Sequence, residues 1–369
     1  MTEREAYIAL NMMDRIGPVG VRSLVGVLGS AAAIFEAPID ELKKAAGIGQ
    51  ELAASIVRQR DTLDLDSELK HAVETDTRII TVLDEEYPPT LRDIHDPPLA
   101  LYMRGALLPK DRHAVAVVGT RRATRYGMDV TRKFAYQLGQ AGICVTSGLA
   151  LGVDTVAHEG ALQGGGRTVA VIGSGLDHIY PDQNIELAQR IADGNGALLS
   201  VFPFSRKPDK TTFPMRNRIV SGMSTGVLVV EAGKRSGAII TANQALAQGR
   251  SVFAVPGRID SFMSVGTNAL LKDGAFAVTC VQDILEHFEM LIPRQAYEGS
   301  PESKAVIKPP ELSEDGNKIV GLLEKGEMSV DALIRESGIS TARISSLLIT
   351  LELKKIIRIL PGREVELIG

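Results

Sequence analysis

The chain has 369 residues but no tryptophan, and its aromatic content is only 4%. Proteins that grip nucleic acid mainly by base stacking use aromatic side chains as platforms. If this chain binds a nucleic acid, we therefore expect contacts with the phosphate backbone to dominate. It has only two cysteines, Cys144 and Cys280, both at the ends of strand-like runs and without the spacing of a metal site. They are predicted to be reduced core thiols of a cytoplasmic protein.

Long apolar runs and an excess of positive charge are also missing. No segment reaches the roughly 18 apolar residues that cross a bilayer, so no membrane contact is expected. The net charge of -4 argues against a protein that coats nucleic acid non-specifically, although a local basic groove remains compatible with it. No group of histidines, cysteines or carboxylates has ligand spacing, so no metal or other cofactor is expected.

Turn residues and apolar periodicity divide the chain into four parts. Short helices joined by glycine turns come first. Within them, residues 16–28 and 45–56 have the pattern of helix-hairpin-helix motifs, which expose backbone N–H groups to phosphate. A helical domain with a purely structural role explains the two segments equally well. The predicted parts are a helix-hairpin-helix or SAM-like all-α domain (1–75), a Rossmann-like domain (76–292), a proline-rich linker (293–312) and a winged-helix domain (313–369). Sequence-specific recognition of DNA by the winged-helix domain is not favoured, since its candidate recognition helix has little positive charge beyond Arg343.

Strands and helices alternate through the central part. The alternation predicts an α/β fold with a parallel sheet and right-handed crossovers. Short apolar runs ending in glycine or a turn are typical of strands buried on both faces. Seven such runs are expected to be strands: 113–119, 143–148, 168–173, 197–202, 226–233, 251–257 and 275–280. The segment 78–108, with two Pro-Pro pairs, is expected to supply the connector and the first strand of the domain.

Cations and glycines gather where these strands end, which is the edge at which such sheets bind ligands. Three arginines follow Gly119 at a helix start, where the helix dipole repels cations unless an anion is bound. Consecutive glycine loops favour a long groove and an extended polyanion. The predicted phosphate contacts are Gly119, Thr120, Arg121, Arg122, Ser147, Gly148, Arg216, Asn217, Arg218, Lys234, Ser236 and Gly237.

Three other polar residues allow a structural interpretation. Asp154 is expected to be the N-cap of the helix that follows it, and His158 a structural histidine. Glu231 could act as an acid or base, but an ion pair with Arg218 or Lys234 is the favoured interpretation. Neither G-x-G-x-x-G nor the P-loop pattern is present, which excludes a P-loop ATPase.

Long, ordered motifs resemble the DNA-processing protein A (DprA, also called Smf) family. They are GTRRATRYG, TSGLALGVDTVAHEGAL, VIGSGLDHIYPDQN, FPMRNRIVSGMSTGVLVVEAGKRSGAIITA and VFAVPG followed by VGTNALLKDGA. The resemblance implies a non-enzymatic, homodimeric binder of single-stranded DNA that protects incoming DNA and helps load the RecA recombinase during natural transformation. It also implies that Arg121, Arg216, Asn217 and Arg218 hold DNA phosphates, with Lys234 nearby, and that the dimer forms through the Rossmann-like domain.

The sequence departs from the family pattern at Val201, where an acidic residue is usual, and at Thr120, where serine is common. A rival interpretation is a nucleotide phosphoribohydrolase on a related fold. Those enzymes carry P-G-G-x-G-T-x-x-E at the equivalent loop, whereas this chain has VEAGKRSGAIITA. The missing glycine pair and glutamate disfavour the enzyme.

Overall fold

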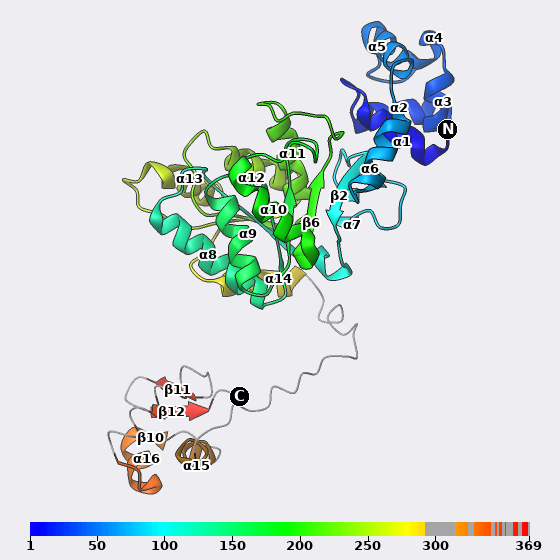
Figure 1. The fold of residues 1–369 in the computed structure, drawn as a ribbon. Helices are drawn as coiled ribbons and strands as arrows, with labels where there is room; N and C mark the ends of the chain where they lie inside the picture. The colour runs from blue at the N-terminus through cyan, green and yellow to red at the C-terminus, as the bar shows by residue number, and fades with distance from the viewer. Residues whose placement is uncertain are drawn as a thin grey trace. The chain divides into compact units, whose positions relative to one another are not determined.

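The computed structural model describes residues 1–291, 314–323, 328–340, 344, 347–348, 351, 357–360 and 364–367. Two compact units make up the chain, Met1–Leu291 and Ile292–Gly369, and each is described by itself (Figure 1). The predicted linker 293–312 and Arg343 lie outside the described residues.

Six helices form the start of the first unit: α1 (Glu3–Met12), α2 (Pro18–Leu28), α3 (Ala31–Glu36), α4 (Ile39–Leu42), α5 (Gln50–Arg60) and α6 (Leu65–Glu74). The first five enclose an apolar cluster that includes Leu10, Leu24 and Ile56, whereas Ala72 of α6 packs in a cluster with strand residues. α2 and α5 begin at Gly17 and Gly49, neither of which offers a capping side chain. The glycine turns expected from the sequence are therefore real helix starts.

A nine-stranded sheet follows, in the order β1-β2-β6-β5-β4-β3-β7-β8-β9. The strands are β1 (Arg78–Thr81), β2 (Ala100–Gly105), β3 (Ala114–Val118), β4 (Cys144–Ser147), β5 (Thr168–Val171), β6 (Gly196–Ser200), β7 (Gly226–Val229), β8 (Ser251–Ala254) and β9 (Phe276–Ala277). The seven predicted strands, β3 to β9, are present and parallel. The Rossmann-like fold is thus confirmed.

The sheet is mixed, because the two strands that the segment 78–108 supplies are antiparallel. β1 and β2 pair antiparallel to each other, and β2 pairs antiparallel to β6. The connection from β1 to β2 carries only the four-residue helix α7 (Pro89–Arg92), not a crossover helix over the sheet, so it returns the chain in the opposite direction. Apolar runs indicate strands but not their direction.

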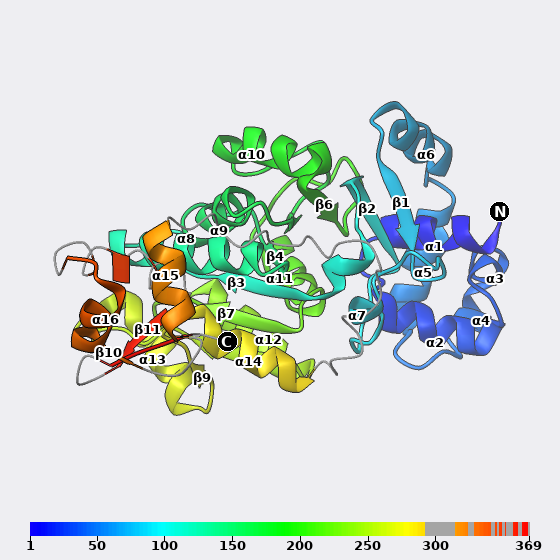
Figure 2. The same cartoon turned by 90° about the horizontal axis from the view of Figure 1, so that it is seen from below.

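Helices cover both faces of the sheet (Figure 2). One face is covered by α8 (Arg125–Gln140), α9 (Val153–Gln163) and α10 (Ile185–Arg190), and the other by α11 (Thr212–Gly222), α12 (Gly237–Ala247) and α13 (Val265–Lys272). Alternate strand residues such as Ala116 and Val118 join α11 and α12 residues in the largest apolar cluster. Burial on both faces explains the nearly uninterrupted apolar strands.

The two cysteines differ in their surroundings. Cys144 is buried in β4, as predicted, whereas Cys280 is exposed. The core assignment of Cys280 is wrong because β9 is only two residues long and exposed. Cys280 instead lies just before α14 (Val281–Leu291), where its N–H donates to Asp283.

The second unit has the elements of a winged helix. Its described helices are α15 (Glu314–Leu323) and α16 (Val330–Ser337), and its described strands β10 (Met328–Ser329), β11 (Ile357–Leu360) and β12 (Glu364–Leu367) form an antiparallel sheet. Ile319, Leu333 and Val365 belong to its own buried cluster. Within the described part of the whole chain, no helix is long and apolar enough to cross a membrane.

Candidate nucleic-acid interface

A cavity of about 360 Å³ opens at the carboxyl edge of the sheet, between the loops that follow β3, β4 and β7. The chain leaves β3 toward β4 but leaves β7 toward β8, so this is the topological switch point at which open sheets bind ligands. A smaller pocket of about 30 Å³ adjoins it and shares Arg121, Phe213 and Arg216. We call the two together the groove.

Seven of the twelve predicted contacts line the groove: Gly119, Arg121, Gly148, Arg216, Asn217, Ser236 and Gly237. The other five line neither cavity: Thr120, Arg122, Ser147, Arg218 and Lys234. The hydroxyl of Ser147 donates to the Val117 carbonyl at 2.7 Å, and Thr120 Oγ1 accepts from the Arg122 N–H at 3.2 Å. Both hydroxyls thus serve the fold.

Arg216, on α11, forms the floor of the groove. Its side chain is only 4% exposed and its Nη1 lies 3.9 Å from Asp154 Oδ2. Its Nε has no hydrogen-bond partner among the described residues. Burial lowers the pKa of this guanidinium to about 10, so it still carries its charge at neutral pH. A buried cation with unused donors is costly unless an anion completes its contacts.

Asp154 holds Arg216 and the loop after β4 in place. Its Oδ2 accepts the N–H of Gly148 at 3.1 Å and of Ala150 at 3.4 Å, and burial raises its pKa. The predicted N-cap role is wrong, because Gly152, with φ +81°, is the N-cap and Asp154 lies within the first turn. The backbone N–H groups of the loop after β4, rather than those of the helix start, hold this carboxylate next to Arg216.

The loop after β3 is fixed by a buried carboxylate. Thr124 caps α8, and both its N–H and its hydroxyl donate to Glu231, at 2.9 and 2.6 Å. Gly127 leaves room for that carboxylate, since a Cβ there would overlap it. The expected ion pair of Glu231 with Arg218 or Lys234 is therefore wrong, and Glu231 is not among the groove-lining residues. It positions the backbone that carries Arg121.

Aromatic rings are more prominent in the groove than the composition suggested. The Arg121 guanidinium carbon lies 4.9 Å from the centre of the Phe213 ring, and the rings of Phe213 and Tyr180 are 6.0 Å apart. Lys210 also lines the cavity. Phe213, Tyr180 and Lys210 are not among the contacts predicted from the sequence. The signal for Lys210 was available, since a cation just before the start of α11 faces the same helix-dipole argument as Arg121.

Arg218 faces away from the groove. It donates to the Asp96 carbonyl and its Nη1 lies 3.2 Å from the Asp96 carboxylate. It lines a different cavity, between the N-terminal helices and the sheet. Residues two apart on a helix do not share a face, which separates Arg218 from Arg216.

His158 is structural, as expected. It is fully buried in α9, and its Nδ1 lies 2.7 Å from the hydroxyl of Thr168. Burial lowers its pKa to about 3, so it is neutral at physiological pH.

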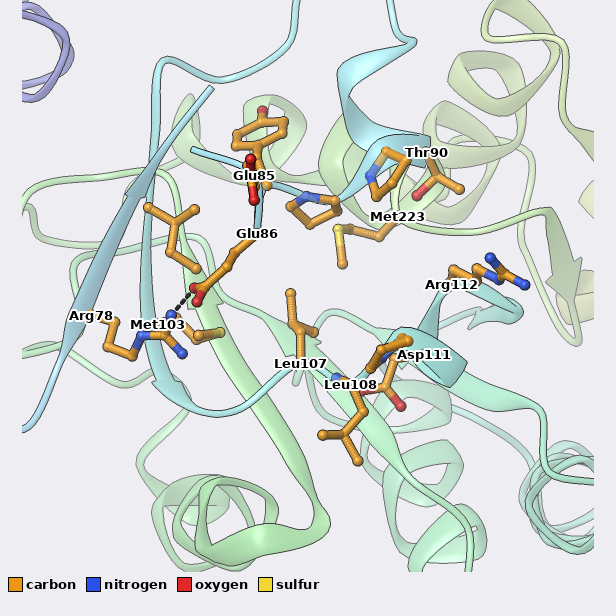
Figure 3. Close-up of a pocket in the computed structure, with 15 residues that line it drawn as sticks. Arg78, Glu85, Glu86, Thr90, Met103, Leu107, Leu108, Asp111, Arg112 and Met223 are labelled. Carbon is orange, nitrogen blue, oxygen red and sulfur yellow. Dashed lines mark hydrogen bonds and ion pairs between the residues drawn. The ribbon is translucent and has the colours of Figure 1, made fainter. Parts of the chain in front are cut away.

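A further cavity of about 420 Å³ lies at the opposite edge of the sheet, where its lining includes Met103, Leu107 and Met223 (Figure 3). Arg78 pairs with Glu86 at its rim. Its apolar floor and paired charge make it a poor site for a polyanion. No group of three or more metal-ligating side chains occurs within the described part of the chain.

Comparisons with known proteins show which proteins this chain is similar to. Residues 78–289 match the family model of DNA recombination-mediator protein A, and residues 303–363 match that of the DprA winged helix domain. The chain is 38% identical to Protein Smf of Escherichia coli (strain K12) over 311 residues, which are 82% of this chain and 81% of that protein. It is 43% identical to DNA processing protein DprA of Bacillus subtilis (strain 168) over 209 residues, 56% of this chain and 70% of that one.

Two solved structures are similar as well. DNA processing protein A from Streptococcus pneumoniae superposes with a TM-score of 0.67 at 33% identity, covering 78% of this chain and 98% of that one. DNA processing protein A from Helicobacter pylori, in a structure described as revealing its single-stranded DNA binding mode, gives a TM-score of 0.52 at 33% identity, covering 58% and 96%.

Proposed function

The chain belongs to the DNA recombination-mediator protein A (DprA/Smf) family, and from this premise we propose that it binds single-stranded DNA in the groove during natural transformation. In this role it protects incoming DNA and assists loading of the RecA recombinase. The observation that carries the proposal is Arg216, a buried cation that lines the groove. Its Nε has no hydrogen-bond partner among the described residues, and Asp154, the carboxylate beside it, is 3.9 Å away.

Three cations, Arg121, Lys210 and Arg216, line the same cavity. Arginine forks and a lysine ammonium match phosphate oxygens spaced along a strand. Phe213 adds a ring with the Arg121 guanidinium over its face, and an unpaired base stacks against this pair. A base in a duplex is paired and stacked within the helix, so this combination favours single strands.

The groove is arranged for binding rather than catalysis. Asp154 is buried and engaged with Arg216 and two backbone N–H groups. Glu231 is buried against Thr124. Neither carboxylate is placed to act on a bound nucleotide, which counts against the phosphoribohydrolase alternative.

We also propose a homodimer through the Rossmann-like domain, in the cytoplasm. The support is three exposed apolar side chains in β9 and in the segment after β8: Ile259 is 97% exposed, Phe262 70% and Phe276 49%. Such side chains are costly to leave in water and are typical of an interface.

Fluorescence anisotropy of a labelled single-stranded oligonucleotide tests the proposal. The wild type is compared with Arg121→Gln/Lys210→Gln and with the control Lys133→Gln, an exposed α8 residue that does not line the groove. We expect the wild type to bind tightly and to keep the oligonucleotide in the presence of competing duplex or AMP. We expect only the double variant to lose binding. Displacement by AMP at low concentration would instead support the nucleotide enzyme.

A further inference from the structure

A second and larger cavity lies between the N-terminal helices and the sheet. It measures about 830 Å³ and is lined by residues 11–18 on one side and by residues 201–203 and 205–209 on the other. We call it the cleft. Asn11 of α1 joins the two sides by donating to the Val201 carbonyl at 3.1 Å.

Four cations line the cleft, Arg15, Arg206, Lys207 and Arg218, against two carboxylates, Asp14 and Asp209. Arg218 is engaged with Asp96, and Arg206 with Asp209 at 2.9 Å and Asp14 at 3.7 Å.

Two of the cations remain available to a ligand. Lys207 is exposed and has no ion pair within the described part of the chain. Arg15 is 66% exposed and only 4.0 Å from Glu51, itself 90% exposed, a contact of little energetic weight. One available cation thus stands on each side of the cleft. Apolar side chains such as Met12, Ile16 and Met215 also line the cleft, so the two cations stand at the edge of a mixed surface. Among the described residues no group of three or more metal-ligating side chains competes with them.

A third cavity, which shares lining residues with both sites, lies between the cleft and the groove. Lys207 and Pro208 line both the cleft and this cavity of about 850 Å³. Tyr180 lines that cavity and also the groove. The start of α11 separates the two sites, with Arg216 and Asn217 on the groove side and Met215 and Arg218 on the cleft side.

We propose that the cleft is a second phosphate-binding site, which receives the part of a single strand that extends beyond the groove. The strand passes Tyr180, reaches Lys207 and ends against Arg15 at the start of the N-terminal helices. This gives the helical domain a function, since the predicted hairpin at Gly17 and Pro18 lines the same cleft. The inference rests on the proposed function, because it extends the strand that the groove holds.

Binding measured against strand length tests it. Dissociation constants are measured for poly-dT of about 5 and about 20 nucleotides, lengths that bracket the usual site of a single binding module. The variant is Arg15→Gln/Lys207→Gln, and the charge-matched control is Lys133→Gln/Arg190→Gln, two exposed residues outside the groove and the cleft. Thermal unfolding confirms that both variants fold.

We expect the Arg15→Gln/Lys207→Gln variant to lose about tenfold in affinity for the long strand and to match the wild type on the short one. Its slope of log K against log salt on the long strand should also be shallower by about 1.4, from two phosphates at about 0.7 each. Three results would overturn the cleft as a phosphate-binding site. They are unchanged affinity of the variant for the long strand, an equal loss of affinity for both lengths, and the same loss in the control. A wild type that binds neither length would overturn the groove itself, and the cleft with it.

Discussion

Replacing Gly148 with alanine tests the geometry of the groove floor. A Cβ at this position would overlap the Arg216 guanidinium, and even the more distant Nη2 would lie only 2.7 Å away. Either the loop after β4 or Arg216 must move. Since Asp154 binds both the Gly148 N–H and Arg216, movement of either one disturbs the same network.

The magnitudes follow from overpacking and from the lost phosphate contact. Overpacking costs about 1–3 kcal/mol of unfolding free energy. Loss of one charge-assisted hydrogen bond to phosphate costs about 1.5–3 kcal/mol of binding free energy, which is about a tenfold to hundredfold weaker complex. The salt slope should become shallower by about 0.7. Gly26→Ala is the control, because a Cβ there meets nothing within 4 Å.

The wild type, Gly148→Ala, Arg216→Gln and the double variant Gly148→Ala/Arg216→Gln form a double-mutant cycle. The affinity of each for a single strand is measured by anisotropy titration. The effects should be strongly non-additive, because both changes remove the same contact. A folded Gly148→Ala protein that binds like the wild type, or effects that simply add, would refute the assignment of Arg216 as the phosphate contact.

Three further predictions concern stacking, pH and assembly. Phe213→Leu should weaken binding of single strands by about 1–3 kcal/mol in the same titrations; unchanged affinity would rule out stacking on this ring. His158 has a pKa of 6.5 in the unfolded state and of about 3 in the folded state, so between these values only the unfolded state takes up a proton as the pH falls. The free energy of unfolding should therefore decrease by up to about 1.4 kcal/mol for each pH unit of acidification in this window. Denaturant titrations should show a smaller decrease for His158→Asn. Phe262→Asp, which changes an exposed ring, should shift light scattering toward the monomer; an unchanged mass would place the dimer contact elsewhere.

The sequence predicts much of the fold because burial on both faces leaves a local signature. Each parallel strand is a short apolar run ending in a turn, and all seven were predicted from that pattern. The direction of β1 and β2 leaves no such mark, since it depends on the absence of a crossover helix. Cys280 was misplaced because an edge strand as short as β9 is not buried.

The site was only partly predictable, because it depends on contacts between residues far apart in the chain. Asp154 has the sequence context of an N-cap, but it accepts the N–H groups of Gly148 and Ala150 and lies next to the distant Arg216 instead. Glu231 has cations nearby in sequence, yet Thr124 is its partner. The separation of Arg216 from Arg218 was within reach, since helical geometry places residues two apart on different faces. Phe213 was missed because a low aromatic total says nothing about where the few rings gather.

The salt dependence of binding to a short single strand tests the central claim most directly. Three cations, Arg121, Lys210 and Arg216, line the groove, so at about 0.7 per phosphate the slope of log K against log salt should be about -2. It should become shallower by about 1.4 in Arg121→Gln/Lys210→Gln. A flat response, or a slope that the double variant leaves unchanged, would contradict the groove as the site of DNA binding.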